Sequence, residues 1–143
     1  MKKSTILLAF TLLTFSQVFS QNWITDFSKA KEFSASQHKN IMLVFSGSDW
    51  CGTCIKMENQ IWKSNGFVTY SDKHLILLKV DFPKKKKNRL SDELQAHNDK
   101  LAETYQAKFP LVVILDSDGK VLDSFGFIKD FTPQDYINRI SKL

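Results

Sequence analysis

The sequence predicts a single α/β domain in which a central mixed β-sheet is flanked by helices on both faces. A short, continuous apolar run at residues 41–45 and a largely apolar one at 75–81 are typical of strands that are covered on both sides. Segments with helical spacing of apolar residues alternate with these runs. Near the end of the chain, two further apolar runs are joined by a short Asp-Gly turn, which predicts an antiparallel hairpin and therefore a mixed sheet.

The first half of the chain is expected to hold two strand–helix pairs. Residues 23–24 are predicted as a short strand. Residues 27–37 are predicted as a helix, because apolar or small residues recur there at roughly helical spacing. Residues 41–45 follow as a buried strand, and a turn at 47–49 leads into a predicted helix over 51–62.

The next strand and helix have clear boundaries. After the predicted helix over 51–62, residues 75–81 are predicted as a second buried strand. A helix is then predicted over 91–105, because Ser91 is a suitable N-cap and the carboxylates of Asp92 and Glu93 favour the positive end of a helix.

The last three elements are marked by their turn and cap residues. Residues 111–115 and 121–125 are predicted as two strands joined by a hairpin turn with Asp118-Gly119 at its centre. Thr132 is expected to cap a final helix that opens on proline and runs through Ile140. No internal repeat or low-complexity linker interrupts this order.

The most informative feature is the pair Cys51 and Cys54, which are the only cysteines in the chain. Structural zinc usually needs four ligands, and the chain has neither a second cysteine pair nor closely spaced histidines, so no metal site is expected. A purely structural disulfide closing so short a loop stabilises by only about 2 kcal/mol. The spacing therefore indicates a dithiol that opens and closes.

The position of the pair indicates how it would react. Residues i and i+3 share one face of a helix, so the two sulfurs can meet the geometry of a disulfide. Cys51 is expected at a helix N-terminus, where free N–H groups and the helix dipole favour a thiolate and lower the pKa of the thiol. Cys51 is thus the predicted nucleophile, Cys54 the predicted resolving thiol, and no cofactor is implied.

Residues 1–20 are expected to be a signal peptide that is cleaved between Ser20 and Gln21. They combine an N-terminal Lys2-Lys3 pair, an apolar stretch over 6–19 and small residues before the cut. The stretch is shorter than the ~20 apolar residues of a membrane span. The prediction is a soluble domain over 21–143 that is exported, most simply to a bacterial periplasm, where nucleic acid is not an expected partner.

The basic character of the chain is local. Without its first 20 residues the formal charge falls from +5 to +3, because two lysines are removed. The five cations Lys84 to Lys87 and Arg89 carry a charge of +5, which is more than that net charge of +3. Such a cluster can attract an acidic partner or an anionic membrane. The favoured interpretation is a solvated surface loop, which is what charged runs in loops usually are.

Over residues 23–143 the chain resembles the thioredoxin superfamily. Within it, the chain is similar to exported thioredoxin-like proteins such as the C-terminal periplasmic domain of DsbD, with which it shares the lead-in Ser48-Asp49-Trp50-Cys51 and an acid, Glu58, four residues after the second cysteine. The residues that carry the wider resemblance are Trp50-Cys51-Gly52-Thr53-Cys54, Asp81, Phe109-Pro110, Asp118-Gly119-Lys120 and Gly126.

The resemblance implies a thioredoxin fold and a set of site residues. Pro110 is expected to follow a cis peptide bond and to face the cysteines, with an ordinary proline at the start of a strand as the alternative. Phe109 is a candidate substrate contact. The rim beside Cys51 is expected to be shaped by Trp50, Gly52 and Thr53.

Three further positions are judged against the family pattern. Glu58 falls on the helical face of the cysteines, so it is either a group that holds or passes a proton or a solvated carboxylate. Thioredoxins commonly bury an aspartate six residues before the first cysteine, where this chain has Phe45. Leu111 follows Pro110 where threonine is common, which favours a more apolar groove.

The resulting functional hypothesis is a monomeric periplasmic thiol–disulfide oxidoreductase. Its partners would be exported proteins that carry disulfides or thiols, together with a membrane electron donor. The reducing direction is favoured, because Gly52-Thr53 does not resemble the proline–histidine pair of strong oxidants. The alternative is a thioredoxin-like binding or adaptor module in which the dithiol is only a redox switch.

Overall fold

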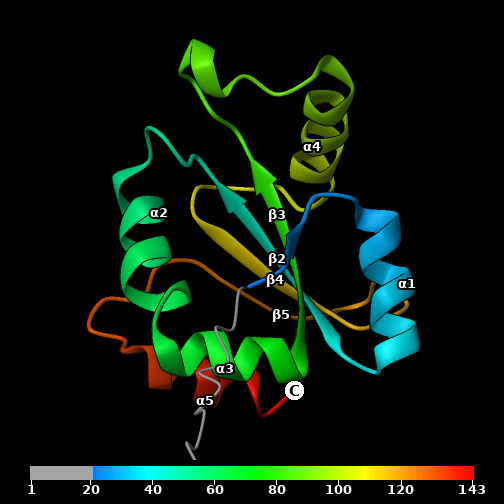
Figure 1. The fold of residues 1–143 in the computed structure, drawn as a ribbon, viewed down its shortest axis with the longest axis vertical. Coiled ribbons are helices and arrows are strands. Elements are labelled where there is room, and N and C mark those ends of the chain that lie inside the picture. Colours follow the sequence, from blue (N-terminus) through cyan, green and yellow to red (C-terminus); the bar gives the residue numbers. More distant parts are fainter. Residues whose placement is uncertain (1–20) are drawn as a thin grey trace, which may run out of the picture.

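Residues 21–143 are described in the computed structural model, and the predicted signal peptide lies outside the described residues. Within that range the strands form one five-stranded sheet in the order β1-β3-β2-β4-β5 (Figure 1). The strands are β1 (Trp23–Ile24), β2 (Asn40–Ser46), β3 (Leu75–Asp81), β4 (Leu111–Leu115) and β5 (Val121–Phe125).

The sheet is mixed, as the hairpin predicts. β3 lies between β1 and β2 and is parallel to both. β4 pairs antiparallel with β2, and β5 pairs antiparallel with β4. The turn between β4 and β5 uses Gly119 at a φ of 87°, a conformation that glycine adopts without a steric penalty. The predicted α/β thioredoxin fold is confirmed.

Helices cover both faces of the sheet (Figure 1). The helices are α1 (Phe27–Gln37), α2 (Gly52–Met57), α3 (Asn65–His74), α4 (Asp92–Thr104) and α5 (Pro133–Ile140). Alternate residues of β2 supply the two cores: Leu43 belongs to the cluster under α1 and α4, and Val44 to the cluster under α2, α3 and α5. None of the helices within the described range is long and apolar enough to cross a membrane.

The region after the cysteines differs from the prediction. The expected single helix over 51–62 is α2 followed by a π-helical segment, η1 (Glu58–Trp62). Helix α3, capped by the hydroxyl of Ser64, then precedes β3, where no element was predicted. Phe67 and Ser71 of α3 are buried and Tyr70 packs on the same core, a helical spacing that was not recognised in the sequence.

The predicted caps of the later helices are confirmed. The Ser91 hydroxyl accepts the N–H of Leu94 at the start of α4. At the start of α5, Thr132 and Asp135 form a capping box: the Thr132 hydroxyl accepts the N–H of Asp135, and the Asp135 carboxylate accepts the N–H of Thr132. The two helix starts are therefore specified locally by the sequence.

Candidate active site

Cys51 and Cys54 are joined by a disulfide at the start of α2, with their Cα atoms 5.2 Å apart. Cys51 is the N-cap of the helix, and its sulfur accepts the N–H of Cys54 at 3.2 Å. Both side chains are largely covered, with exposed fractions of 8% for Cys51 and 4% for Cys54. The first sulfur therefore lies where a backbone donor can stabilise a thiolate, as the sequence predicts.

The turn that carries the cysteines is tied to the ends of β2 and β3. The N–H of Cys51 donates to the carbonyl of Gly47 at 2.8 Å. The N–H and hydroxyl of Ser48 both donate to the carboxylate of Asp81. A Cβ atom at Gly47 would lie 2.7 Å from atoms of the Trp50 indole, so glycine leaves the space that the ring fills. From the sequence, Gly47 was expected only to form part of a turn.

An aromatic rim lies beside the disulfide. Trp50 is 39% exposed, and its ring meets that of Phe109 edge-on with centroids 5.7 Å apart. Phe82 packs against Phe109 with centroids 5.1 Å apart. The indole N–H of Trp50 donates to the carbonyl of Phe82 at 2.6 Å, which fixes the ring's orientation. Phe82 was not identified from the sequence, because an aromatic residue directly after the apolar strand 75–81 gave no separate signal.

Pro110 lies at the same edge of the sheet as the cysteines. The Phe109–Pro110 peptide bond is cis, as the resemblance implies. The next residue, Leu111, pairs with Phe45 near the end of β2, which places the start of β4 beside the turn that leads to Cys51. A Cβ atom at Gly126 would lie 3.1 Å from the carbonyl oxygen of Pro110, so glycine allows this close backbone approach.

A polar cavity of about 280 Å³ is lined by Cys54 and Glu58 together with Ser46 and Lys79. The Glu58 carboxylate lies 3.5 Å from the ammonium of Lys79 and 3.7 Å from that of Lys63. Glu58 is thus an ion-paired group beside the second cysteine rather than a freely solvated carboxylate. Lys79 was missed, although a lysine inside the otherwise apolar β3 was a signal that could have identified it.

Position 45, where thioredoxins commonly have an aspartate, faces away from the second cysteine. Phe45 is fully buried in the core under α1 and α4, where its ring packs against Tyr105. It therefore does not line the cavity beside Cys54. The β2 residue that does line that cavity is Ser46, which is 7% exposed. The alternation of side chains along a strand is what separates the two positions.

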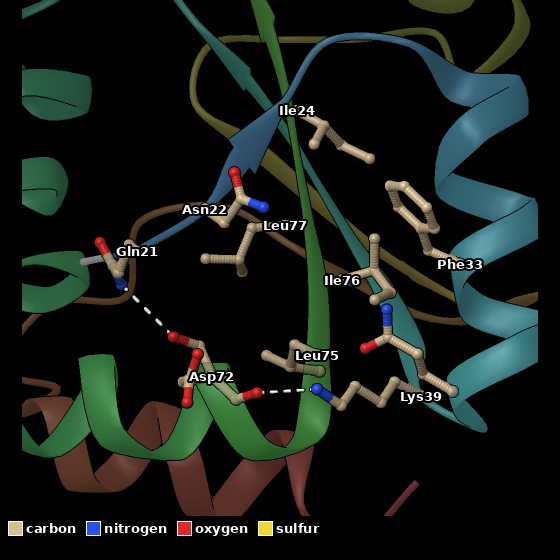
Figure 2. Close-up of a pocket in the computed structure, with 11 residues that line it drawn as sticks. Gln21, Asn22, Ile24, Phe33, Lys39, Asp72, Leu75, Ile76 and Leu77 are labelled. Atoms are coloured by element: carbon tan, nitrogen blue, oxygen red, sulfur yellow. Dashed lines mark hydrogen bonds between the residues drawn. The ribbon is translucent and has the colours of Figure 1, made fainter. Parts of the chain in front are cut away.

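A second cavity, of about 210 Å³, lies away from the cysteines between β1, β3, α1 and α3 (Figure 2). Lys39 and Asp72 both line it, and the Lys39 ammonium donates to the Asp72 carbonyl at 2.8 Å. None of the site residues expected from the sequence lines it. Within residues 21–143, no three His, Cys, Asp or Glu side chains are grouped to hold a metal ion.

Comparison with known proteins decides the family, since residues 22–117 match a family model described as thioredoxin-like. The chain belongs to the thioredoxin-like family. It is 41% identical over 102 residues to the disulfide bond reductase DsbH of Chlamydia pneumoniae, covering 71% of this chain and 60% of that protein. The chain thus spans less than two thirds of that relative's length.

Solved structures agree with this assignment. A structure titled DsbH oxidoreductase superposes with a TM-score of 0.78 at 34% identity, covering 92% of this chain and 90% of the other. The oxidised C-terminal domain of DsbD from Neisseria meningitidis gives a TM-score of 0.54 at 20% identity, covering 85% of this chain and 98% of that domain. The second likeness concerns the fold alone, and it agrees with the resemblance seen in the sequence.

Proposed function

We propose that the protein is an exported thiol–disulfide oxidoreductase that acts on disulfides or thiols of other exported proteins. The observation that carries the proposal is the Cys51–Cys54 disulfide at the start of α2, next to an aromatic rim and the start of β4. Membership of the thioredoxin-like family and the relative named disulfide bond reductase support it. Export rests on the leader expected over residues 1–20.

In the reducing direction the reaction transfers two electrons from the Cys51–Cys54 dithiol to the partner's disulfide. The Cys51 thiolate attacks one sulfur of the partner's disulfide, forms a mixed disulfide and releases the partner's other sulfur as a thiolate, which takes up a proton. Cys54 then loses its proton and attacks the Cys51 sulfur. This step releases the partner's second thiol and restores the Cys51–Cys54 disulfide. An exported or membrane protein with a reduced dithiol must supply the next electron pair.

The residues around the pair have distinct proposed roles. Trp50 and Phe109 offer an apolar surface to the chain segments that flank the partner's disulfide. Pro110 holds the start of β4 at the same edge of the sheet, where the partner's backbone can approach. Gly52 and Thr53 are exposed in the first turn of α2 and leave the approach to the disulfide open.

Glu58 is proposed to accept the proton of Cys54 in the second step. Both side chains line one cavity, and the pairing with Lys79 holds the carboxylate there. Glu58→Gln is expected to slow release of the mixed disulfide by roughly 100-fold, the lower end of the range of general base catalysis, while the first attack by Cys51 is unchanged. Glu103→Gln, at an exposed position of α4, is the matched control. If Glu58→Gln and Glu103→Gln release the mixed disulfide at the same rate, Glu58 is not the proton acceptor.

A pair of cysteine variants tests the catalytic proposal against the adaptor alternative. Cys54→Ser should accumulate partner proteins as mixed disulfides on Cys51, detected by non-reducing electrophoresis and reversed by dithiothreitol. The double variant that also carries Cys51→Ser should trap nothing, and Cys51→Ser alone should abolish turnover. Full turnover in Cys51→Ser would exclude Cys51 as the nucleophile. Unchanged partner binding without any trapped species would favour the adaptor.

The direction of the reaction follows from the reduction potential of the pair. Equilibration of the oxidised protein with graded glutathione or dithiothreitol buffers measures it. A potential near the roughly −270 mV of thioredoxin supports the proposed reductase, and one near the roughly −120 mV of strong periplasmic oxidants reverses the direction.

A further inference from the structure

The basic segment after β3 is held against the turn that carries the cysteines. The carboxylate of Asp49 accepts the backbone N–H groups of Lys84 and Lys85 at 2.9 and 3.0 Å and the side-chain amide of Asn88 at 2.8 Å. The N–H donated by Lys84 is the main cause that lowers the pKa of Asp49 below 3.8. The segment is therefore ordered by the residue two positions before Cys51.

The aromatic rim holds the same segment from a second side. The Lys84 ammonium lies 3.9 Å from the centroid of the Trp50 ring. The Trp50 indole also donates to the carbonyl of Phe82, just before the basic residues. Phe82 in turn packs on Phe109, next to Pro110. We call the surface formed by Trp50, Phe82, Phe109 and the segment 84–89 the basic rim.

The basic rim carries more positive charge than the whole exported domain. The five cations at 84–87 and 89 exceed the net +3 that is left without residues 1–20, so the other charged residues of the domain sum to −2. Arg89 pairs with Asp92 at 3.2 Å, whereas within residues 21–143 the ammonium groups of Lys85, Lys86 and Lys87 make no ion pair. All five side chains belong to exposed residues. Their mutual repulsion is a cost that a bound anionic group relieves.

We propose that the basic rim binds an acidic segment of the partner protein that flanks its reactive disulfide. The inference rests on the proposed function and adds the charge of the partner to it. A partner disulfide that reaches Cys51 must lie beside Trp50, so residues a few positions away from it in the partner can reach the lysines. A membrane surface is disfavoured as the ligand, because a bilayer spread over this rim would cover the disulfide that the reaction needs exposed.

Two peptide disulfides test the inference. They have the same length and the same cystine, and they differ only in four flanking residues, which are Glu in one and Gln in the other. At low ionic strength, wild type carrying a reduced Cys51–Cys54 pair is expected to reduce the Glu peptide at least 10-fold faster, within the range of electrostatic steering. About 0.5 M salt should remove most of that preference.

Two matched multiple variants locate the effect. The rim variant K85Q/K86Q/K87Q/R89Q should lose most of the preference and keep the rate with the Gln peptide. The control variant K29Q/K73Q/K120Q/K142Q removes the same four charges from exposed residues elsewhere and should keep the preference. Equal losses in the two variants would show that only net charge matters and would overturn the inference.

A single variant tests whether the preference depends on the ordered position of the segment 84–89 or only on its charge. Asp49→Ala makes the protein more positive by one charge but removes the acceptor that holds the segment. The preference for the Glu peptide is expected to fall, whereas a pure charge effect would raise it. Asp72→Ala makes the same charge change on α3 and should leave the preference unchanged.

The remaining outcomes distinguish this inference from the proposed function. Equal rates of wild type with both peptides would overturn the acidic-partner inference and leave the oxidoreductase intact. No reaction with either peptide would contradict the proposed function itself. If the rim variant loses binding to phosphatidylglycerol vesicles while wild type shows no peptide preference, the rim binds membranes and the inference is wrong.

Discussion

Replacement of Trp50 tests whether the rim beside the disulfide is held by specific contacts. The Trp50 side chain makes three separable interactions: the indole N–H bond to Phe82, the edge-on contact with Phe109 and the cation–π contact with Lys84. Trp50→Phe removes the hydrogen bond and keeps an aromatic ring. Trp50→Ala removes all three interactions.

The expected losses follow from these contacts. A hydrogen bond of this kind contributes about 1 kcal/mol net. An aromatic pair adds about 0.5–1.5 kcal/mol, and a cation–π contact at an exposed site about 0.5–1 kcal/mol. Trp50 is 39% exposed, so values near the lower ends apply. We expect the free energy of unfolding to fall by about 1 kcal/mol in Trp50→Phe and by about 2 kcal/mol in Trp50→Ala.

Urea unfolding of the oxidised protein measures both values, and amide hydrogen exchange shows where the change occurs. Faster exchange is expected at residues 82–89 in both variants. Trp23→Phe is the control, because it removes one indole N–H bond, to Gln21, on the edge strand β1 and should leave exchange at 82–89 unchanged. If Trp50→Phe retains wild-type stability and wild-type exchange, the bond to Phe82 does not hold the rim and the reasoning is wrong.

Two further predictions concern the core and the pH dependence of stability. Tyr136 is fully buried and its hydroxyl accepts the N–H of Ile128, so Tyr136→Phe should lower the free energy of unfolding by about 1–3 kcal/mol, whereas Tyr70→Phe should change it by less than about 0.5 kcal/mol. The two tyrosines are compared by urea unfolding, and equal losses would contradict the assignment. The side-chain hydrogen bond from Arg139 lowers the pKa of Asp123 below 3.8. The ion pair should therefore add on the order of 1 kcal/mol above pH 3.8, and this is lost as the pH falls through the lowered pKa of the folded state. The difference in unfolding free energy between wild type and Asp123→Asn, measured across that pH range, should shrink towards zero in acid, and a difference that stays constant with pH would refute this origin.

The local elements that the sequence predicts correctly are those whose signals lie within a few residues. Ser91 and Thr132 cap α4 and α5 because a cap needs only its own hydroxyl and the N–H three residues later. Cys51 caps α2 in a similar way, because its sulfur accepts the N–H of Cys54 three residues later. Helix α3 was missed although Phe67, Tyr70 and Ser71 have the spacing of one helical face.

The position of side chains across the sheet was harder to predict. The resemblance compares Phe45 with a buried aspartate of thioredoxins, and the pleat of β2 turns Phe45 to one core and Ser46 to the cavity beside Cys54. Likewise, Lys79 and Glu58 are 21 residues apart and meet only because β3 lies beside β2. Because side chains alternate between the two faces of a strand, neighbouring residues face opposite sides of the sheet.

By itself, the sequence determined the dithiol, its place at a helix N-terminus and the α/β class, because each depends on short-range geometry or on a compact motif, and the cis proline followed from the family resemblance. Only the tertiary structure decided what surrounds the dithiol. The bonds from Asp49 to the segment 84–89 join residues 35 to 39 positions apart. From its charge alone this segment was expected to be a solvated loop. The bonds to Asp49 make it an ordered surface next to Cys51. Contacts at that separation depend on how strands are ordered in the sheet, which no local pattern specifies.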